Sequence, residues 1–524
     1  METPEAPRSW RSDPLIGRIV ACVFLLAVCW IIGNPRSAGP DEPSHMVTSA
    51  AVVRGEFDGN VPPDNPAVEV FELPGMVGEP DPVCWAQQPT VPVGCAPTDG
   101  LVTEQEPRAT TSSNYAPWSF VLPGLASLTP WASGYAYLAR LLNAALPIAL
   151  LSGGLIALAR GRPAAAPAAL LGLTPIVWFT IGTVNPSAIA IAGGFALWVG
   201  LLVPPGSLAS ALALGGWASL LLARRDGPLW ATAIVLVCCA AMRVRPKELW
   251  ERVGPPTRWA ALAMVPVALV PVIQRGDFGF NALLGATTIG LVVVDQAIRW
   301  WINHPSRSTR VAVTTIGVAL GIWVLVAAMA LRPGGFQAET LRLVMSNTGQ
   351  HLQQIVGVLG WLDAPVPVTG VLLFWAGIGG LAAVARLELP RVATVFCVAL
   401  AAAIVTAWVL ELGQGSSYGS YWQGRYTMPF AVGLPILLAW RPTADTLIER
   451  LGGPLVTVAW IVANVGFLAA QRRWGVGVDG SWYPWDWDTW GAPAPPVLLV
   501  IAHAAISAAL ARSVLVGRAV EAAT

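Results

Sequence analysis

The sequence contains few charged residues. Only 12% of its 524 residues are Asp, Glu, Lys or Arg, about half the share found in an ordinary soluble protein. Hydrophobic residues make up 55% of the chain, and the mean hydropathy is +0.60. A soluble fold cannot bury that much apolar sequence, so we expect an all-α polytopic integral membrane protein.

Several motifs that are typical of soluble enzymes are also missing. The sequence has no P-loop, no G-x-G-x-x-G after a strand, no G-x-S-x-G and no Cys/His set at metal-ligand spacing. These absences argue against nucleotide chemistry on the cytoplasmic side, and we expect no nucleic-acid partner. No internal repeat recurs at a fixed period, so the sequence gives no support to a transporter built from inverted repeats.

Cysteine is scarce outside the apolar runs. Cys84 and Cys95 share a polar segment, whereas the other cysteines of the chain fall in apolar sequence. Two cysteines that stand alone in an oxidising compartment predict a disulfide. The alternative is a pair of free thiols.

Apolar runs long enough to span a bilayer recur from Leu15 to the C-terminus. We predict about fourteen transmembrane helices, with ends uncertain by roughly 2–4 residues. Their ranges are 15–33, 133–159, 164–183, 187–203, 206–223, 228–242, 259–274, 279–298, 311–331, 366–385, 391–411, 427–440, 453–470 and 495–512.

Basic residues set the expected orientation in the plasma membrane. They concentrate in loops on the side of the N-terminus, most densely at 243–258, and basic loops face the cytoplasm. We interpret the first helix as retained, not as a signal peptide. The predicted order is a cytoplasmic tail (1–14), the first helix (15–33), an extracytoplasmic loop (34–132), a helical domain (133–512) with outer loops at 332–365, 412–426 and 471–494, and a cytoplasmic tail (513–524).

An acidic corner follows the first helix. Segment 39–45 reads G-P-D-E-P-S-H, and its prolines stiffen the turn. A partly desolvated Asp41 or Glu42 can serve as general base toward a hydroxyl, with His45 beside it as a third catalytic candidate. The two acids are also the candidate ligands of a divalent cation, Mg or Mn. The alternative is a pair of solvated acids that ends the helix.

The acidic corner leads into an amphipathic stretch at residues 46–57. Met46, Val47, Ala50 and other apolar residues share one helical face there. We predict that this face lies on the membrane surface while His45, Ser49, Glu56 and Asp58 point outward.

One arginine falls inside a predicted span. Arg140 lies in the second helix, where a charged side chain is costly and has a functional reason by default. Its expected partners are Asp41, Glu42 or the phosphate of a lipid-linked substrate. The alternative is an arginine that snorkels to the surface.

Other arginines lie on the acidic outer side. Arg224, Arg225 and Arg425 run against the charge trend of the topology, and the planar fork of arginine suits phosphate oxygens. We predict that they bind a donor phosphate together with Arg140. Pairing with Asp226, Glu411 or lipid headgroups remains the alternative.

The outer loops supply candidates for substrate binding. Aromatic faces stack on sugar rings, and polar side chains between them accept sugar hydroxyls. An interfacial aromatic belt is the competing explanation for the tryptophans of the last loop. The candidates are Asn185, His351, Tyr421, Trp422, Gln423, Tyr426, Trp485 and Trp487.

Taken in order, several short motifs resemble the GT-C superfamily of membrane glycosyltransferases. More closely, the chain is similar to a family of polytopic membrane proteins that is common in actinobacteria and in surface-polysaccharide loci, with a D-E-P-x-H first outer loop. The resemblance rests on residues 40–45, A-R-L-L-N at 139–143, N-P-S at 185–187, G-W-L-D at 360–363 and Q-G-R-Y at 423–426. It does not cover residues 60–110 or the last outer loop, 471–494, with its tryptophans.

The resemblance implies a glycosyltransferase whose sugar donor is polyprenyl-phosphate-linked. Asp41 or Glu42 would activate a hydroxyl of a cell-envelope glycan, lipid or protein. The chain lacks the large C-terminal soluble domain of many GT-C enzymes, which places substrate binding on its loops. Two other interpretations stay open: a transporter or flippase of a lipid-linked glycan, and a non-catalytic scaffold of envelope assembly.

Overall fold

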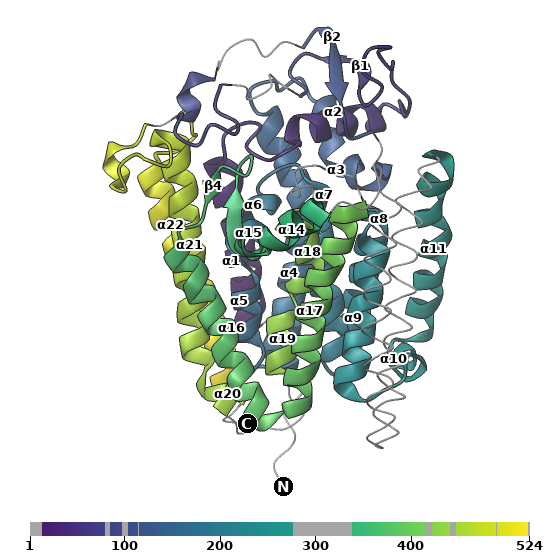
Figure 1. Ribbon diagram of the computed structural model, residues 1–524, viewed down its shortest axis with the longest axis vertical. Coiled ribbons are helices and arrows are strands. Elements are labelled where there is room, and N and C mark those ends of the chain that lie inside the picture. The colour runs from purple at the N-terminus through teal and green to yellow at the C-terminus, as the bar shows by residue number, and fades with distance from the viewer. Residues whose placement is uncertain are drawn as a thin grey trace.

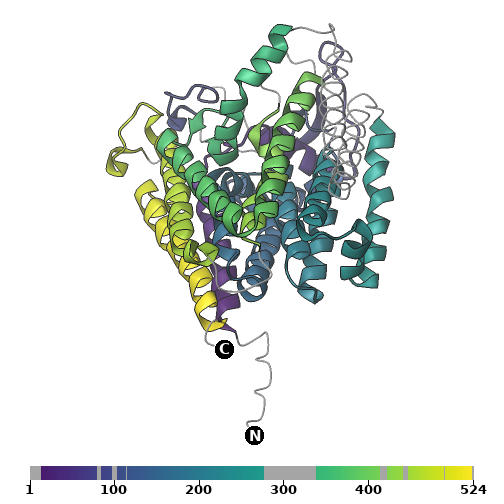
Figure 2. The same cartoon turned by 60° about the horizontal axis from the view of Figure 1, so that its bottom comes forward.

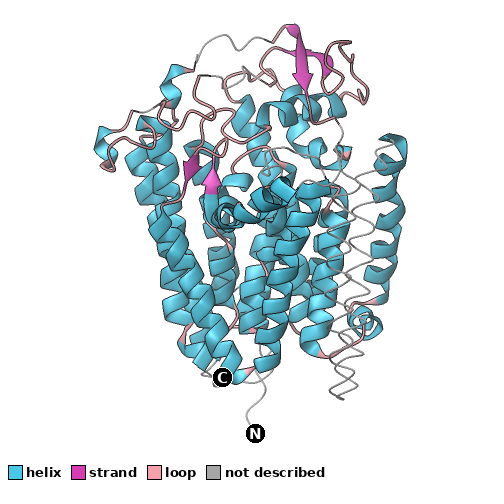
Figure 3. Cartoon of the chain, in the orientation of Figure 1, coloured by secondary structure: helices cyan, strands magenta, loops and turns pink. Residues whose placement is uncertain are grey.

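The chain forms a bundle of helices with a loop-rich layer at one end (Figures 1 and 3). The computed structural model describes residues 13–78, 84–96, 103–113, 115–275, 338–413, 422–440, 447–488 and 490–521. The first outer loop, with its short strands, lies at the end of the bundle opposite to the start of α1 and the end of α22 (Figures 1 and 2). The start of α1 and the end of α22 therefore lie at the same end of the bundle (Figures 1 and 2).

Within this part of the chain, six helices are long and apolar enough to cross a membrane. They are α1 (Pro14–Gly33), α4 (Tyr135–Gly161), α16 (Val368–Glu388), α17 (Pro390–Gly413), α21 (Gly452–Val476) and α22 (Pro496–Glu521). The pair α9 (Gly227–Met242) and α10 (Pro246–Arg252), bent by 97°, makes a seventh if it is one span. A polytopic helical membrane protein is thus confirmed, and about fourteen helices stays a prediction.

Several predicted spans take another form. The spans at 279–298 and 311–331 lie outside the described residues. Span 164–183 is broken into α5 (Ala166–Gly172) and α6 (Pro175–Ile181), because Pro175 forces Thr174 into an extended conformation. The hydroxyl of Thr174 then donates to the carbonyl of Ile355 at 2.9 Å. Span 427–440 is likewise divided into α18 (Gly424–Ala431) and α19 (Leu434–Ala439).

The remaining elements are short or lie between the spans. The antiparallel pair β1–β2 joins Glu69 to Thr110 at one end of its register. The other elements are α2 (Glu42–Val53), β1 (Glu69–Pro74), η2 (Val93–Cys95), β2 (Gln105–Thr110), η3 (Pro117–Phe120), α3 (Val121–Gly124), η4 (Leu125–Leu128), α7 (Pro186–Leu202), α8 (Ser207–Ala223), α11 (Pro255–Arg275), α14 (Ala338–Ser346), α15 (Thr348–Gly357), β3 (Val358–Leu359), β4 (Ala364–Pro365), α20 (Leu447–Arg450) and η5 (Pro484–Asp486).

Helix α7 is the core of the bundle, since every one of its residues is buried. Glycine lets a neighbour approach closely: a Cβ on Gly194 would lie 1.8 Å from the carbonyl oxygen of Pro429 in α18. At the start of α18, a Cβ on Gly424 would lie 2.6 Å from the side chain of Gln354. Small residues at such crossings give helices close contact inside a membrane. Their effect here is to fix α18, which carries Arg425.

The prediction of a surface helix at residues 46–57 is wrong. Met46, Val47 and Ala50 of α2 are buried, but so are His45 and Ser49 on the face expected to point outward. The strands β1 and β2 cover α2, and Phe71 and Leu73 of β1 join its apolar cluster. The helical period could not reveal this cover, because it comes from a loop segment distant in sequence.

The predicted disulfide is present between Cys84 and Cys95. The loop that the disulfide closes, residues 84–95, is fixed to helix α21 by Arg473. This side chain donates to the carbonyls of Val91 at 2.7 Å and Trp85 at 2.8 Å. The same guanidinium pairs with Asp363 at 2.7 Å, and both side chains are buried. The disulfide loop, α21 and the β3–β4 hairpin therefore form one unit.

Removing the disulfide should loosen this unit. A closed loop of this length restricts the unfolded chain by about 3 kcal/mol, so the Cys84→Ser and Cys95→Ser variants should expose the loop to limited proteolysis at lower temperature than wild type. A membrane-impermeant maleimide should modify these cysteines in the wild-type protein only after reduction. Modification without reductant would contradict the disulfide.

Candidate functional site

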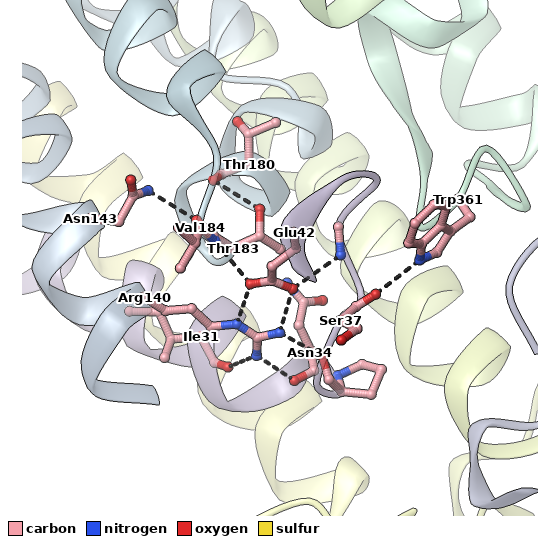
Figure 4. A network of polar contacts seen from close by, with 12 residues as sticks. Ile31, Asn34, Ser37, Glu42, Arg140, Asn143, Thr180, Thr183, Val184 and Trp361 are labelled. Carbon is pink, nitrogen blue, oxygen red and sulfur yellow. Dashed lines mark hydrogen bonds and ion pairs between the residues drawn. The ribbon is translucent and has the colours of Figure 1, made fainter. Parts of the chain in front are cut away.

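The acidic corner is a tight turn between α1 and α2. Asp41 is the N-cap residue of α2 and has φ 64° and ψ 3°, a left-handed conformation that costs a non-glycine residue energy. Residues in such strained conformations cluster at functional sites. The tryptophan side chain of Trp361 donates to the Ser37 carbonyl at 2.9 Å and holds the turn from one side (Figure 4).

Arg140 holds the other side of the turn. Its Nε and Nη2 atoms donate to the two carboxylate oxygens of Glu42, each at 2.8 Å, and both side chains are fully buried (Figure 4). The remaining N–H groups donate to the backbone carbonyls of Ile31, Asn34 and Pro35 at 3.1, 2.8 and 2.6 Å. A guanidinium has five N–H donors, and all five are therefore used.

These contacts correct two predictions. Arg140 has no donor left for a phosphate, so it positions the turn. Glu42 also accepts from the backbone N–H groups of Val184 at 2.9 Å and Gly39 at 3.3 Å, which occupies its oxygens with four donors and leaves it unsuited as a base. The sequence allowed either acid as the partner of Arg140, and the strained turn decides between them.

Asp41 points the other way, toward α18. Its side chain is 44% exposed, and its Oδ2 accepts from Nη2 of Arg425 at 3.2 Å. The same nitrogen donates to the hydroxyl of Tyr426 at 3.1 Å. The Nε of Arg425 is buried without a hydrogen-bond partner in the part of the chain that is described. Asp41 is therefore the accessible acid, and it lies beside Arg425, whose Nε–H group has no partner among the described residues.

Arg224 completes a pair of guanidinium groups around one tyrosine. Its Cζ lies 4.2 Å from the ring centroid of Tyr426, and that of Arg425 lies 5.1 Å away. Arg224 also donates to Asp226 at 2.9 Å and Ser187 at 3.3 Å, which confirms the pairing with Asp226 that the sequence left open. We call Asp41, Arg224, Arg425 and Tyr426 the outer cluster. Arg225 follows Arg224 in the chain and is half-buried; its role as a phosphate ligand stays a prediction.

His45 lies behind the outer cluster. Its ring is buried between Tyr115 and Phe120, at centroid distances of 5.5 and 5.7 Å. Burial lowers the pKa of His45 to about 4; Asp41 opposes this shift and the two arginines add to it. The imidazole is therefore neutral at pH 7. No sequence pattern pointed to Tyr115, which closes the pocket around it.

Of the other candidates, the structure brings His351 and Trp422 to one place. The His351 Nε2 and the Trp422 Nε1 each lie 3.1 Å from the hydroxyl of Thr427 in α18. They line a narrow hollow of about 30 Å³, together with Asn347, Gln350, Gln354, Trp408 and Glu411. The hollow combines indole faces with amide and carboxylate groups. Thr427, which links the two residues, was not among the sequence candidates.

Gln423 lines a second, smaller hollow of about 10 Å³, which is also bordered by Pro40, Gly424 and Arg425. The Oε1 of Gln423 is buried without a hydrogen-bond partner among the described residues. Tyr421 lies outside the described residues. The residues beside Arg425 thus line a mostly apolar hollow with a few polar groups next to the outer cluster.

Three candidates do not join this site. The side chain of Asn185 accepts from the backbone N–H of Ser187 at 2.9 Å and caps α7. Trp485 is exposed and contacts Tyr483, while Trp487 is buried and donates to the carbonyl of Ser481. Both tryptophans belong to the loop between α21 and α22 at the upper left of Figure 1.

The predicted cation pair does not fit either. Glu42 is saturated by Arg140 and backbone N–H groups, and Asp41 is directed toward Arg425. Among the described residues no group of three or more His, Cys, Asp or Glu side chains is placed to hold a metal ion. We therefore derive no step through Mg or Mn.

Fold and site together define a polytopic helical membrane protein with a polar cluster where its first outer loop meets the helices. The chain belongs to the DUF2142 family of predicted membrane proteins, whose family model matches residues 24–434. No curated protein and no solved structure matches the chain. The family match covers the acidic corner, Arg140 and the outer cluster.

Breaking the Glu42–Arg140 pair should destabilise the fold. Removing one partner of a buried pair leaves an uncompensated charge and costs about 3–5 kcal/mol, so Arg140→Met should lower the unfolding temperature in detergent sharply. Arg386→Met, an exposed helix arginine, should change stability by less than about 0.5 kcal/mol. Adding Glu42→Gln to Arg140→Met should restore part of the loss. Equal stability of the two single variants would refute the assignment.

The neutral His45 predicts a pH dependence. Its pKa is about 4 in the folded protein, against an ordinary value of 6.5, so below pH 6.5 the unfolded chain binds a proton that the folded chain does not. Stability should fall by about 1.4 kcal/mol per pH unit between pH 6.5 and 4 on account of this residue. Unfolding of His45→Gln should be less steep in pH across that window. Parallel curves for variant and wild type would contradict a buried neutral imidazole.

Proposed function

We propose that this protein is a GT-C-like glycosyltransferase of the plasma membrane. It moves a sugar from a polyprenyl-phosphate-linked donor to a glycan, lipid or protein of the cell envelope, on the extracytoplasmic side. One observation carries the proposal: a half-exposed carboxylate, Asp41, lies against Arg425, and the ring of Tyr426 links Arg425 to Arg224, where the first outer loop meets the helices. A base beside two phosphate-binding groups is what this reaction requires.

The arginines supply the donor site. The phosphate oxygens of the lipid bind the Nε and Nη atoms of Arg425, whose Nε has no partner among the described residues. Binding of the phosphate draws Arg425 from Asp41, and the carboxylate is then released as a base. The ring of Tyr426 contacts both guanidinium groups. Arg224, held by Asp226, contributes positive charge without moving.

The sugar binds at the opening of the hollow lined by His351, Trp408 and Trp422, and this hollow of about 30 Å³ widens to admit it. A pyranose ring has apolar C–H faces that stack on indole rings, and its hydroxyls bind amide and carboxylate groups. Thr427 is hydrogen-bonded to two residues that line the hollow, His351 and Trp422. It lies in α18, the short helix that also carries Arg425. The phosphate and the sugar of one donor molecule can therefore be held from the same short helix.

The reaction is a single displacement. An acceptor hydroxyl attacks the anomeric carbon, and the bond from that carbon to the phosphate oxygen breaks with its electron pair on the phosphate. The hydroxyl proton passes to Asp41. A phosphate leaves without an acid catalyst, so one carboxylate is enough, in contrast to the two carboxylates of glycoside hydrolysis.

Replacing Asp41 tests the proposal in cells. In a strain that lacks the gene, Asp41→Asn should fail to restore the glycan linkage that wild type restores, because loss of a general base lowers the rate about 10²–10⁴-fold. Asp58→Asn, an exposed acid of the same loop, is the matched control and should restore it. Each variant is compared at equal membrane abundance. Restoration by Asp41→Asn would reject the transferase and favour a flippase or a scaffold.

A further inference from the structure

An uncharged segment with an exposed apolar face precedes α4. Residues 117–131 comprise η3, α3, η4 and the turn after them, and contain no Asp, Glu, Lys or Arg. Six of their large side chains are 40–56% exposed: Trp118, Val121, Leu122, Leu125, Leu128 and Trp131. We call these six residues the apolar stripe. Their spacing of three or four residues places them along one side of a helical path.

The opposite side of the segment is firmly held. Phe120 is buried against the ring of His45, and a Cβ on Gly124 would lie 2.2 Å from the carbonyl oxygen of Ser49 in α2. The guanidinium of Arg54 donates to the hydroxyl and the carbonyl of Ser127 at 2.6 and 2.9 Å. The apolar stripe therefore belongs to a fixed, one-sided structure.

The position of the apolar stripe beside a transmembrane helix indicates which molecules cover it. The transmembrane helix α4 begins at Tyr135, a few residues after Trp131. Segments that lie flat in the interface place Trp and Leu in the boundary between headgroups and acyl chains, and tryptophan marks that depth in membrane proteins. A soluble partner would need a polar rim, which an uncharged segment of this length does not offer.

We propose that residues 117–131 lie flat in the outer leaflet, with the apolar stripe inserted among the lipids. The inner side of the segment then holds Phe120 and His45, and with them the outer cluster, at the depth of the headgroups. A substrate with a lipid anchor reaches Asp41 at that depth without leaving the membrane. The inference stands independently of the sugar chemistry proposed above.

Spin labels measure this depth. Leu122→Cys and Leu125→Cys are each introduced into a Cys397→Ser background, since the other free cysteines are buried, and the protein is reconstituted in lipid nanodiscs. Val61→Cys is the matched control: an exposed aliphatic residue of the same outer loop, 53% exposed, outside the segment. Accessibility to oxygen and to a water-soluble nickel chelate is then recorded, with the background protein as the labelling blank.

The proposal expects labels at 122 and 125 to favour oxygen over the nickel chelate, at a depth just below the lipid phosphates. The label at 61 should favour the chelate. Chelate accessibility at 122 and 125 equal to that at 61 would place the stripe in water and overturn the proposal. Labels shielded from both reagents would also overturn it, because they would show a protein partner on the stripe.

Discussion

The buried pair between Glu42 and Arg140 is the interaction on which the site depends. It fixes the turn after α1 by using every N–H group of the arginine, in two bonds to the carboxylate and three to backbone carbonyls. Such a pair is costly to desolvate and stabilises the fold only when every donor and acceptor is satisfied. Because Glu42 is held inward, its neighbour Asp41 is turned outward into a left-handed conformation. One acid of the doublet is structural, and the other is available for chemistry.

The helix bundle supplies the second half of the site. Close packing of α18 against Gly194 of α7 and against α15 sets the position of Arg425. Arg425 then meets Asp41 across a sequence separation of 384 residues. Arg224, in the turn between α8 and α9, contacts the ring of Tyr426 next to Arg425. The site therefore forms only when the first outer loop and the late helices are assembled, which agrees with a family match that runs through most of the chain.

Part of this arrangement could be predicted from the sequence. Composition identified the membrane class, and the position of two cysteines in a polar loop identified the disulfide. The acidic corner and Arg425 were recognised from residue type and place. The sequence could not tell which acid Arg140 holds, because that choice depends on one backbone torsion. It also misplaced the exposed apolar face: α2 has apolar residues at helical spacing, but β1 and β2 bury it, whereas residues 117–131 are divided among short helices and carry exposed apolar side chains. Tyr115 and Thr427 have no local signature at all.

The central claim is that Asp41 removes the acceptor proton while the arginines hold the departing lipid phosphate. The most direct measurement is the release of polyprenyl phosphate by purified protein in vesicles that contain the lipid-linked sugars extracted from the strain lacking the gene, with envelope acceptor fragments added. Wild type should release polyprenyl phosphate, and Asp41→Asn should still retain the lipid but release it at least about 100-fold more slowly. Equal release by both proteins, or none by wild type with the complete extract, would show that Asp41 is not the base of such a transfer.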